Sequence, residues 1–149
     1  MERLSSIIIV DTSVAIKWFI PETDTDKAVK LRDRYIEGTI NLMAPDILLY
    51  EVANVLRYHP TLQTAQLVDF LKALFDLNLD IIIPSSQLLL KTAKNAKDLN
   101  ITVYDSVYLT LAEEIAGHMV TADEKLHTKV KATGLSRLVE HYEVEWVVG

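Results

Sequence analysis

Short, mainly apolar runs alternate along the chain with longer segments in which apolar residues recur every three or four positions. Four such runs lie at residues 7–10, 41–44, 80–83 and 118–121. A run of consecutive apolar residues is typical of a strand buried on both faces, as in a parallel sheet covered by helices. Residues 138–140 and 144–148 are candidates for further strands.

The segments between these runs have the spacing of amphipathic helices. The segment 46–58 is an example, with four apolar positions on one helix face: Leu48, Val52, Val55 and Leu56. The same spacing predicts helices over residues 14–20, 27–37, 85–99, 104–116 and 124–132, and one that begins at Thr61 or Thr64 and reaches Phe75. Strands that alternate with helices predict an α/β fold with a mostly parallel sheet. The two helices between the second and third runs are expected to form a projecting hairpin.

Composition restricts the class of protein. With 149 residues, 50% of them hydrophobic, and only 4 Gly and 4 Pro, the chain can form one folded domain, expected to span residues 1–149. The absence of cysteine excludes disulfides, zinc–thiolate sites and thiol nucleophiles. No apolar stretch is long enough for a signal peptide core or a membrane span, so we expect a cytoplasmic protein without membrane contact.

The overall charge argues against a simple nucleic-acid binder, because proteins that bind phosphates are usually basic. The net charge is -6 and the isoelectric point is about 5.1. Two effects can still permit such a ligand. Bound divalent cations change the sign of an acidic site, and local lysines act within a Debye length of roughly 8 Å whatever the total charge.

Four acidic residues stand at positions that suggest chemistry. Asp11 and Asp123 each follow a predicted strand, and α/β sheets place their ligand crevices at the carboxyl ends of strands. Asp105 opens a predicted helix. Glu51 lies beside the apolar face of the 46–58 helix, where an acid rarely stays unpaired.

Each of these acids also has a purely structural interpretation. Residues 11–13 could cap the helix that follows them, and Asp105 suits the first turn of a helix because of the helix dipole. Residues 121–124 match a capping box with Thr121 as the N-cap. Glu51 could form a salt bridge with an arginine or a lysine.

If the four carboxylates converge, they must take up protons or hold cations. Two carboxylates about 6 Å apart repel by roughly 3 kcal/mol at an effective dielectric constant of about 20. The sum over all pairs is comparable to a folding stability of ~5–15 kcal/mol. Oxygen ligands without Cys or His suit hard ions such as Mg²⁺ or Mn²⁺. An all-carboxylate site with room for substrate oxygens suits metal-assisted cleavage of a phosphodiester.

Four segments that contain these acids resemble the motifs of PIN domains and, within that family, of the VapC-type ribonuclease toxins. The segments are IVDTS at 9–13, YEVANVL at 50–56, YDSVYLTLA at 104–112 and MVTADEKL at 119–126. Each segment is short, but the order and spacing of all four are specific. The resemblance covers nearly the whole chain.

The resemblance implies a three-layer α/β/α domain around a central, mostly parallel sheet of four or five strands. It implies a quartet that binds Mg²⁺ or Mn²⁺, formed by Asp11, Glu51, Asp105 and Asp123. It also implies residues that border or support the site: Thr12, Ser13, Asn54 and Thr121. The implied activity is hydrolysis of phosphodiester bonds in single-stranded RNA. Toxin members usually form homodimers and are silenced by an antitoxin protein in the active-site groove, so we expect both partners.

Three lysines are candidate contacts to RNA phosphates, although each also suits a solvated helix face. They are Lys17, Lys125 and Lys129. Trp18 and Tyr108 could stack on bases, and Trp18 equally suits the core or a dimer surface.

Other functions remain open at this level. One is a PIN nuclease of RNA processing or decay that has no antitoxin. Another is a receiver-like phosphoacceptor regulator, which also gathers acids around Mg²⁺ but usually carries paired acids after its first strand, where this chain has Asp11 alone. Metal-independent cleavage would need two histidines that face one phosphate, and the spacing of the four histidines neither predicts nor excludes this.

Overall fold

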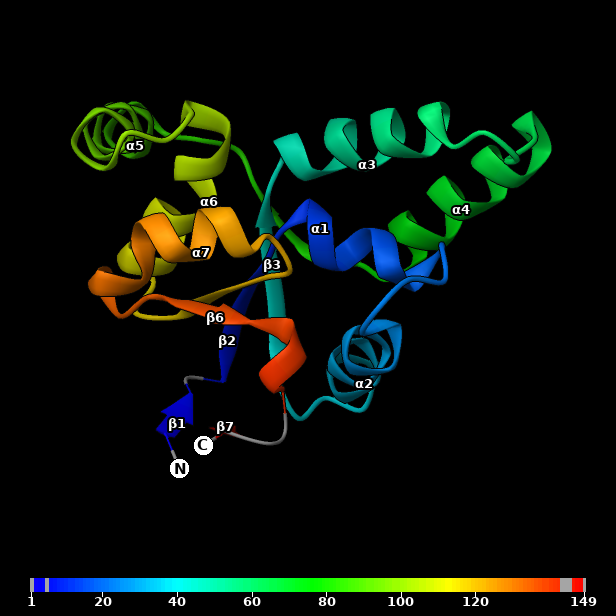
Figure 1. Cartoon of the computed structure of the whole chain (residues 1–149), viewed down its shortest axis with the longest axis horizontal. Helices are drawn as coiled ribbons and strands as arrows, with labels where there is room; N and C mark the ends of the chain where they lie inside the picture. The colour runs from blue at the N-terminus through cyan, green and yellow to red at the C-terminus, as the bar shows by residue number, and fades with distance from the viewer. Residues whose placement is uncertain (1, 5, 143–145, 149) are drawn as a thin grey trace.

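The computed structural model describes residues 2–4, 6–142 and 146–148 (Figure 1). Its central sheet has five parallel strands in the order β4-β3-β2-β5-β6. These are β2 (Ile7–Val10), β3 (Asn41–Pro45), β4 (Asp80–Ile82), β5 (His118–Thr121) and β6 (Ser136–Leu138). A separate parallel pair joins β1 (Glu2–Leu4) to β7 (Trp146–Val148). The four apolar runs therefore form the four predicted strands, and a fifth strand completes the sheet.

Helices cover both faces of this sheet, which confirms the three-layer α/β/α prediction. They are α1 (Thr12–Ala15), α2 (Thr25–Ile36), α3 (Ile47–Tyr58), α4 (Thr64–Asp76), α5 (Ser86–Leu99), α6 (Val103–Glu114) and α7 (Glu124–Val130). Short 3-10 turns follow at η1 (Ile16–Trp18), η2 (Lys131–Thr133) and η3 (Val139–His141). Helix α6 packs against β2, β3 and β5 and carries α5 on its outer side. Helix α2 lies on the opposite side of the sheet, and α3 and α4 project as the expected hairpin (Figure 1).

The core is centred on β2 and α6. Residues 8–10 are fully buried, as a strand covered on both faces requires. Every residue of the segment 106–112 is also buried, because α6 lies between the sheet and α5. Its polar side chains are satisfied there, since Ser106 Oγ donates a 2.8 Å hydrogen bond to the carbonyl of Thr92 and Asn95 donates one to Thr110. This buried helix holds Asp105 at a fixed distance from the sheet edge.

Several boundaries differ from the sequence prediction. The predicted helix 14–20 is α1 followed by the 3-10 turn η1, which ends at Trp18. The last strand of the sheet is β6 (Ser136–Leu138), and the predicted strand at 138–140 turns into η3 because β6 pairs with β5 only as far as Thr121. In the candidate strand 144–148, residues 144–145 lie outside the described residues, and 146–148 pair with β1 instead of joining the central sheet. Helix α2 begins at Thr25, after Asp24 has turned the chain with a φ of 64°.

Among the helices that the structure describes, none is long and apolar enough to cross a membrane.

Candidate active site

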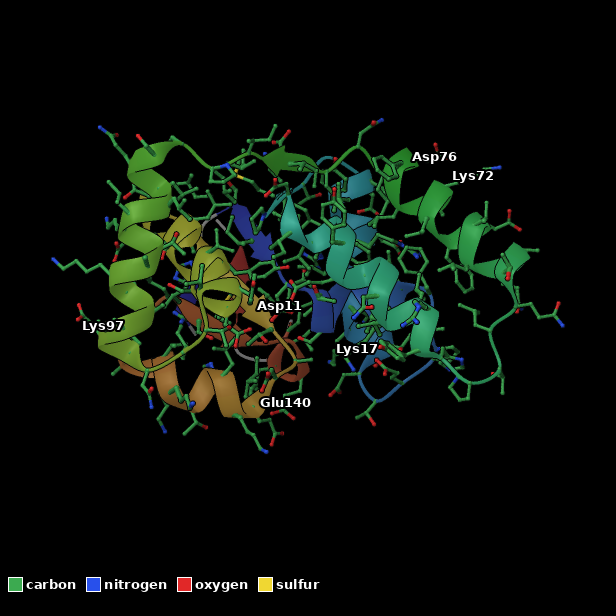
Figure 2. All side chains as sticks on the ribbon, turned by 90° about the horizontal axis from the view of Figure 1, so that it is seen from above. Asp11, Lys17, Lys72, Asp76, Lys97 and Glu140 are labelled. Carbon is green, nitrogen blue, oxygen red and sulfur yellow. The ribbon has the colours of Figure 1, made fainter. Side chains whose placement is uncertain are left out.

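All four predicted acids line one cavity of about 440 Å³ at the carboxyl edge of the sheet. Asp11 and Asp123 reach it because β2 and β5 are parallel neighbours, with Val10 paired to Val120. Glu51 comes from α3 and Asp105 from the first turn of α6. Figure 2 shows Asp11 near the middle of this edge, and Lys72 and Asp76 of α4 far from it. The strand-end argument from the sequence therefore placed the acids in the correct region.

Asp11 is both a helix cap and a wall of the cavity. Its Oδ1 accepts a 2.6 Å hydrogen bond from Ser13 Oγ and a 3.2 Å hydrogen bond from the backbone N–H of Val14, which makes it the N-cap of α1. The side chain is only 6% exposed. Burial raises the pKa of Asp11 to about 6, although its hydrogen bonds with Ser13, Thr121 and Val14 lower it. The capping and functional interpretations of this turn are thus compatible.

Ser13 connects the turn after β2 to the turn after β5. Its Oγ accepts a 2.8 Å hydrogen bond from the N–H of Ala122 and lies 3.3 Å from Thr121 Oγ1. Thr121 Oγ1 in turn accepts from the N–H of Asp123, at 3.0 Å. These contacts hold the turns that carry Asp11 and Asp123 against each other. Thr121 and Ser13 therefore border the acids, and the supporting role that the motif resemblance implied for them stays a prediction.

Asp123 is the N-cap of α7, because its Oδ1 accepts a 3.0 Å hydrogen bond from the N–H of Leu126. The alternative interpretation of residues 121–124 as a capping box, with Thr121 as the N-cap, was therefore wrong. The physical reason is that the chain stays extended through Asp123, with φ of -85° and ψ of 101°, so the helix begins only at Glu124. The Thr121 hydroxyl is used inside the turn instead.

Glu51 is held by two hydroxyl groups. Its Oε1 accepts hydrogen bonds from Thr12 Oγ1 at 3.1 Å and from Tyr108 OH at 2.5 Å. The salt-bridge interpretation of Glu51 was wrong, because no ion pair among the described residues includes Glu51. Arg57 instead lies over the ring of the neighbouring Tyr58, 4.6 Å from its centroid. The sequence named Tyr108 only as a candidate for base stacking, and its contact with Glu51 was missed; the available signal was its position three residues after Asp105, on the same face of α6.

The two candidate stacking residues are both buried. Tyr108 is only 2% exposed, so its ring face is not open to a base. Burial and the neighbouring Glu51 raise the pKa of Tyr108, which therefore stays a neutral donor. Trp18 belongs to the core, where its Nε1–H donates a 2.9 Å hydrogen bond to the carbonyl of Ala28. Base stacking by these two rings is contradicted by the structure.

Asp105 lies in the first turn of α6, as predicted, and Thr102 is the N-cap whose Oγ1 accepts a 3.0 Å hydrogen bond from the Asp105 N–H. Burial raises the pKa of Asp105, the charge of Asp123 adds to this, and Thr102 and Lys129 lower it. Asp123 also raises the pKa of Asp11. The acids thus repel one another across the cavity, as converging carboxylates must.

The donor chemistry of this cavity fits a hard divalent cation. Its acids supply only oxygen ligands, and no histidine of the described residues lines it. A nearby cation would also offset the cost of burying the charge of Asp11. Among the described residues, no three acidic or histidine side chains converge closely enough to hold one ion as they stand.

Asn54 is exposed and outside the lining, whereas its neighbour Val55 lines the cavity.

The three candidate lysines occupy two different environments. Lys17 lines the acid cavity, but it is only 9% exposed and its Nζ pairs with Glu22 Oε1 at 3.4 Å. Lys125 and Lys129 are exposed on α7 and line a second cavity of about 350 Å³. That cavity shares Asp105 and Asp123 with the first one.

An α/β/α fold with a parallel sheet and an acidic cavity at its carboxyl edge defines the structural class. A family model for the PIN domain matches residues 8–132. The chain therefore belongs to the PIN domain family, as its four motifs suggested.

Individual relatives agree with this assignment. The chain is 30% identical over 129 residues to Ribonuclease VapC3 of Pyrobaculum aerophilum, a match that covers 84% of this chain and 95% of the relative. A crystal structure of the protein PAE2754 from Pyrobaculum aerophilum superposes with a TM-score of 0.68 at 22% identity, over 91% of this chain and 85% of that one. A toxin–antitoxin complex from Klebsiella pneumoniae gives a TM-score of 0.65 at 13% identity, over 89% and 97% of the two chains. The two solved structures share the fold.

Proposed function

We propose that this protein is an endoribonuclease that hydrolyses phosphodiester bonds in single-stranded RNA with Mg²⁺ or Mn²⁺, as the toxin of a toxin–antitoxin pair. The observation that carries the proposal is that one cavity is lined by all four acids of the PIN motifs, Asp11, Glu51, Asp105 and Asp123. The relative named Ribonuclease VapC3 supports RNA as the substrate. The PIN match favours a nuclease over a receiver-like regulator.

The cation would be held by carboxylates of these four acids. When bound, it would neutralise charge on the leaving oxygen and lower the pKa of the attacking water. The chain's own contribution is to orient two of these ligands, Asp11 and Glu51, before substrate arrives. Ser13 and Val14 orient Asp11, and Tyr108 orients Glu51. Ligands that are already oriented avoid the reorganisation that mobile side chains would undergo during the reaction.

A partner protein is part of the proposal. The fold neighbour from Klebsiella pneumoniae is a toxin–antitoxin complex, which supports an antitoxin for this chain. Large apolar side chains exposed on α3 and α5, namely Tyr50, Tyr58, Leu89 and Leu90, support a homodimer or another protein contact. Light scattering of the purified protein measures the dimer. Co-purification with the product of an adjacent small reading frame separates a toxin from a PIN nuclease that has no antitoxin.

The activity is tested with purified protein and a fluorescent single-stranded RNA. We expect cleavage with Mg²⁺ or Mn²⁺, none with EDTA, and none by the Asp105→Asn variant. Asp69→Asn is the matched control, because Asp69 is exposed in the middle of α4 and lies outside the acid cavity. Undiminished cleavage in EDTA or by Asp105→Asn would refute the metal-dependent mechanism.

A further inference from the structure

Two smaller cavities adjoin the acid cavity, and they carry different charges. The first, of about 350 Å³, is lined by Lys125 and Lys129 and is called the lysine cavity below. It shares Asp105 and Asp123 with the acid cavity. The second has about 190 Å³ and shares only Lys17 and Ala122 with the acid cavity. A strand of RNA whose scissile phosphate lies at the acids could continue into either one.

The lysine cavity has the chemistry of a nucleotide site. Lys125 and Lys129 are four residues apart on one face of α7. Lys125 makes no hydrogen bond or ion pair with any residue that the structure describes, and Lys129 Nζ donates only a 3.3 Å hydrogen bond, to the carbonyl of Asn100. Ile101 and Leu126 add apolar surface to the lining. Two available ammonium groups suit a phosphate, and apolar side chains suit a ribose or the face of a base.

The second cavity lacks this chemistry. Its lining includes three carboxylates, from Asp24, Glu124 and Glu140. Its lysine, Lys17, is largely buried and already paired with Glu22. Negative charge without an available cation repels the phosphates of RNA. The surroundings of the acid cavity are therefore electrostatically asymmetric.

We propose that the lysine cavity binds the nucleotide next to the scissile phosphate, so that RNA is held on only one side of the acid cavity. The strand then crosses the Asp105 and Asp123 boundary toward α7 and is not held on the Lys17 side. This inference rests on the proposed function, because it assigns a subsite for the same substrate. The lysines fix the register of the strand and do not select a base.

The test measures how each flank of the cleavage site contributes to kcat/KM. Wild-type protein first locates a cleavage site in an unstructured RNA. Oligoribonucleotides are then shortened toward this site from the 5′ or the 3′ end. We expect shortening on one side to lower kcat/KM at least about tenfold, the value of one charge-assisted hydrogen bond. Shortening on the other side should lower kcat/KM less than about threefold.

The variants assign this asymmetry to the lysine cavity. In the Lys125→Gln/Lys129→Gln double variant, kcat/KM for the full-length substrate should fall at least about tenfold. Shortening the substrate on the sensitive side should then lower kcat/KM of this variant only slightly. Lys131→Gln is the control, because Lys131 follows the same helix, is exposed and lies outside the cavity lining. It should behave like wild type. Equal sensitivity of both sides, or full asymmetry in the double variant, overturns the proposal.

Binding separates this inference from the proposed function. If wild type cleaves no RNA, the nuclease proposal fails alone, and fluorescence anisotropy with a labelled oligoribonucleotide still tests the cavity. A site for one phosphate should make the slope of log K against log salt shallower by about 0.7 in the double variant. Identical slopes for wild type, the double variant and Lys131→Gln reject the lysine cavity as a nucleotide site.

Discussion

Asp11→Asn should stabilise the metal-free protein while it removes activity. Burial raises the pKa of Asp11 from 3.8 to about 6 in the folded state. The folded protein therefore holds the proton more tightly than the unfolded chain, and stability falls as the pH rises from 3.8 toward 6. Above that range the ionised carboxylate costs about 3 kcal/mol of unfolding free energy, from a shift of about two pKa units. Asparagine carries no charge and can still accept the hydrogen bonds from Ser13 and Val14.

The assay is urea unfolding of wild type and variant in EDTA at two pH values. The variant should be more stable by about 1 kcal/mol at pH 4.5 and by about 3 kcal/mol at pH 8. Asp69→Asn, an exposed control on α4, should stay within about 0.5 kcal/mol of wild type at both pH values. Adding Mg²⁺ should stabilise wild type more than Asp11→Asn, because a ligand that binds only the folded state adds to stability.

One outcome refutes the reasoning directly. The reasoning fails if Asp11→Asn is no more stable than wild type at pH 8, or if the difference in their free energies of unfolding does not change with pH. Either result would mean that the ionised Asp11 carboxylate does not destabilise the folded protein. A cation bound beside Asp11 would then relieve no electrostatic cost of burying its charge.

Three further variants test the supporting contacts. Tyr108→Phe removes the hydroxyl that donates a hydrogen bond to Glu51, so it should lower the free energy of unfolding in urea by about 1–2 kcal/mol. It should also lower kcat more than it changes KM, whereas a purely structural role of Tyr108 predicts no change in kcat. Ser13→Ala removes a hydrogen bond that lowers the pKa of Asp11, so an NMR titration of that carboxyl should give a pKa above the wild-type value of about 6. Gly117→Ala should lower thermal stability by about 1–3 kcal/mol, because a Cβ there would lie 2.7 Å from a backbone carbonyl of β2, and wild-type stability would contradict this close packing.

The sequence predicted the parts of the fold and site that depend on local pattern. Apolar runs identified four strands of the central sheet. A strand buried on both faces needs an apolar side chain at nearly every position, which describes β2 and β5 but not the edge strand β4, whose residues are exposed or half-buried. Asp11 and Asp123 were placed correctly because parallel neighbouring strands deliver their carboxyl ends to one edge. Glu51 was recognised because an acid beside an apolar helix face needs a partner.

The features that the sequence did not predict depend on contacts between distant segments. The hydrogen bond between Tyr108 and Glu51 joins residues 57 positions apart, so no periodic pattern within one segment of the sequence predicts it. The pairing of β1 with β7 joins the two ends of the described chain in the same way. The capping-box interpretation of residues 121–124 failed because Thr121 and Asp123 compete for the N-cap position within one turn. Only the backbone angles decide between them.

The pairing of β1 with β7 has a practical consequence for experiments. Strand β1 leads into the amino end of β2, so the β1–β7 pair lies at the edge of the sheet opposite the acid cavity (Figure 1). A fluorophore, affinity tag or surface linker attached through either strand would therefore point away from the acid cavity. Immobilised or dye-labelled protein prepared this way should keep that cavity open to solvent.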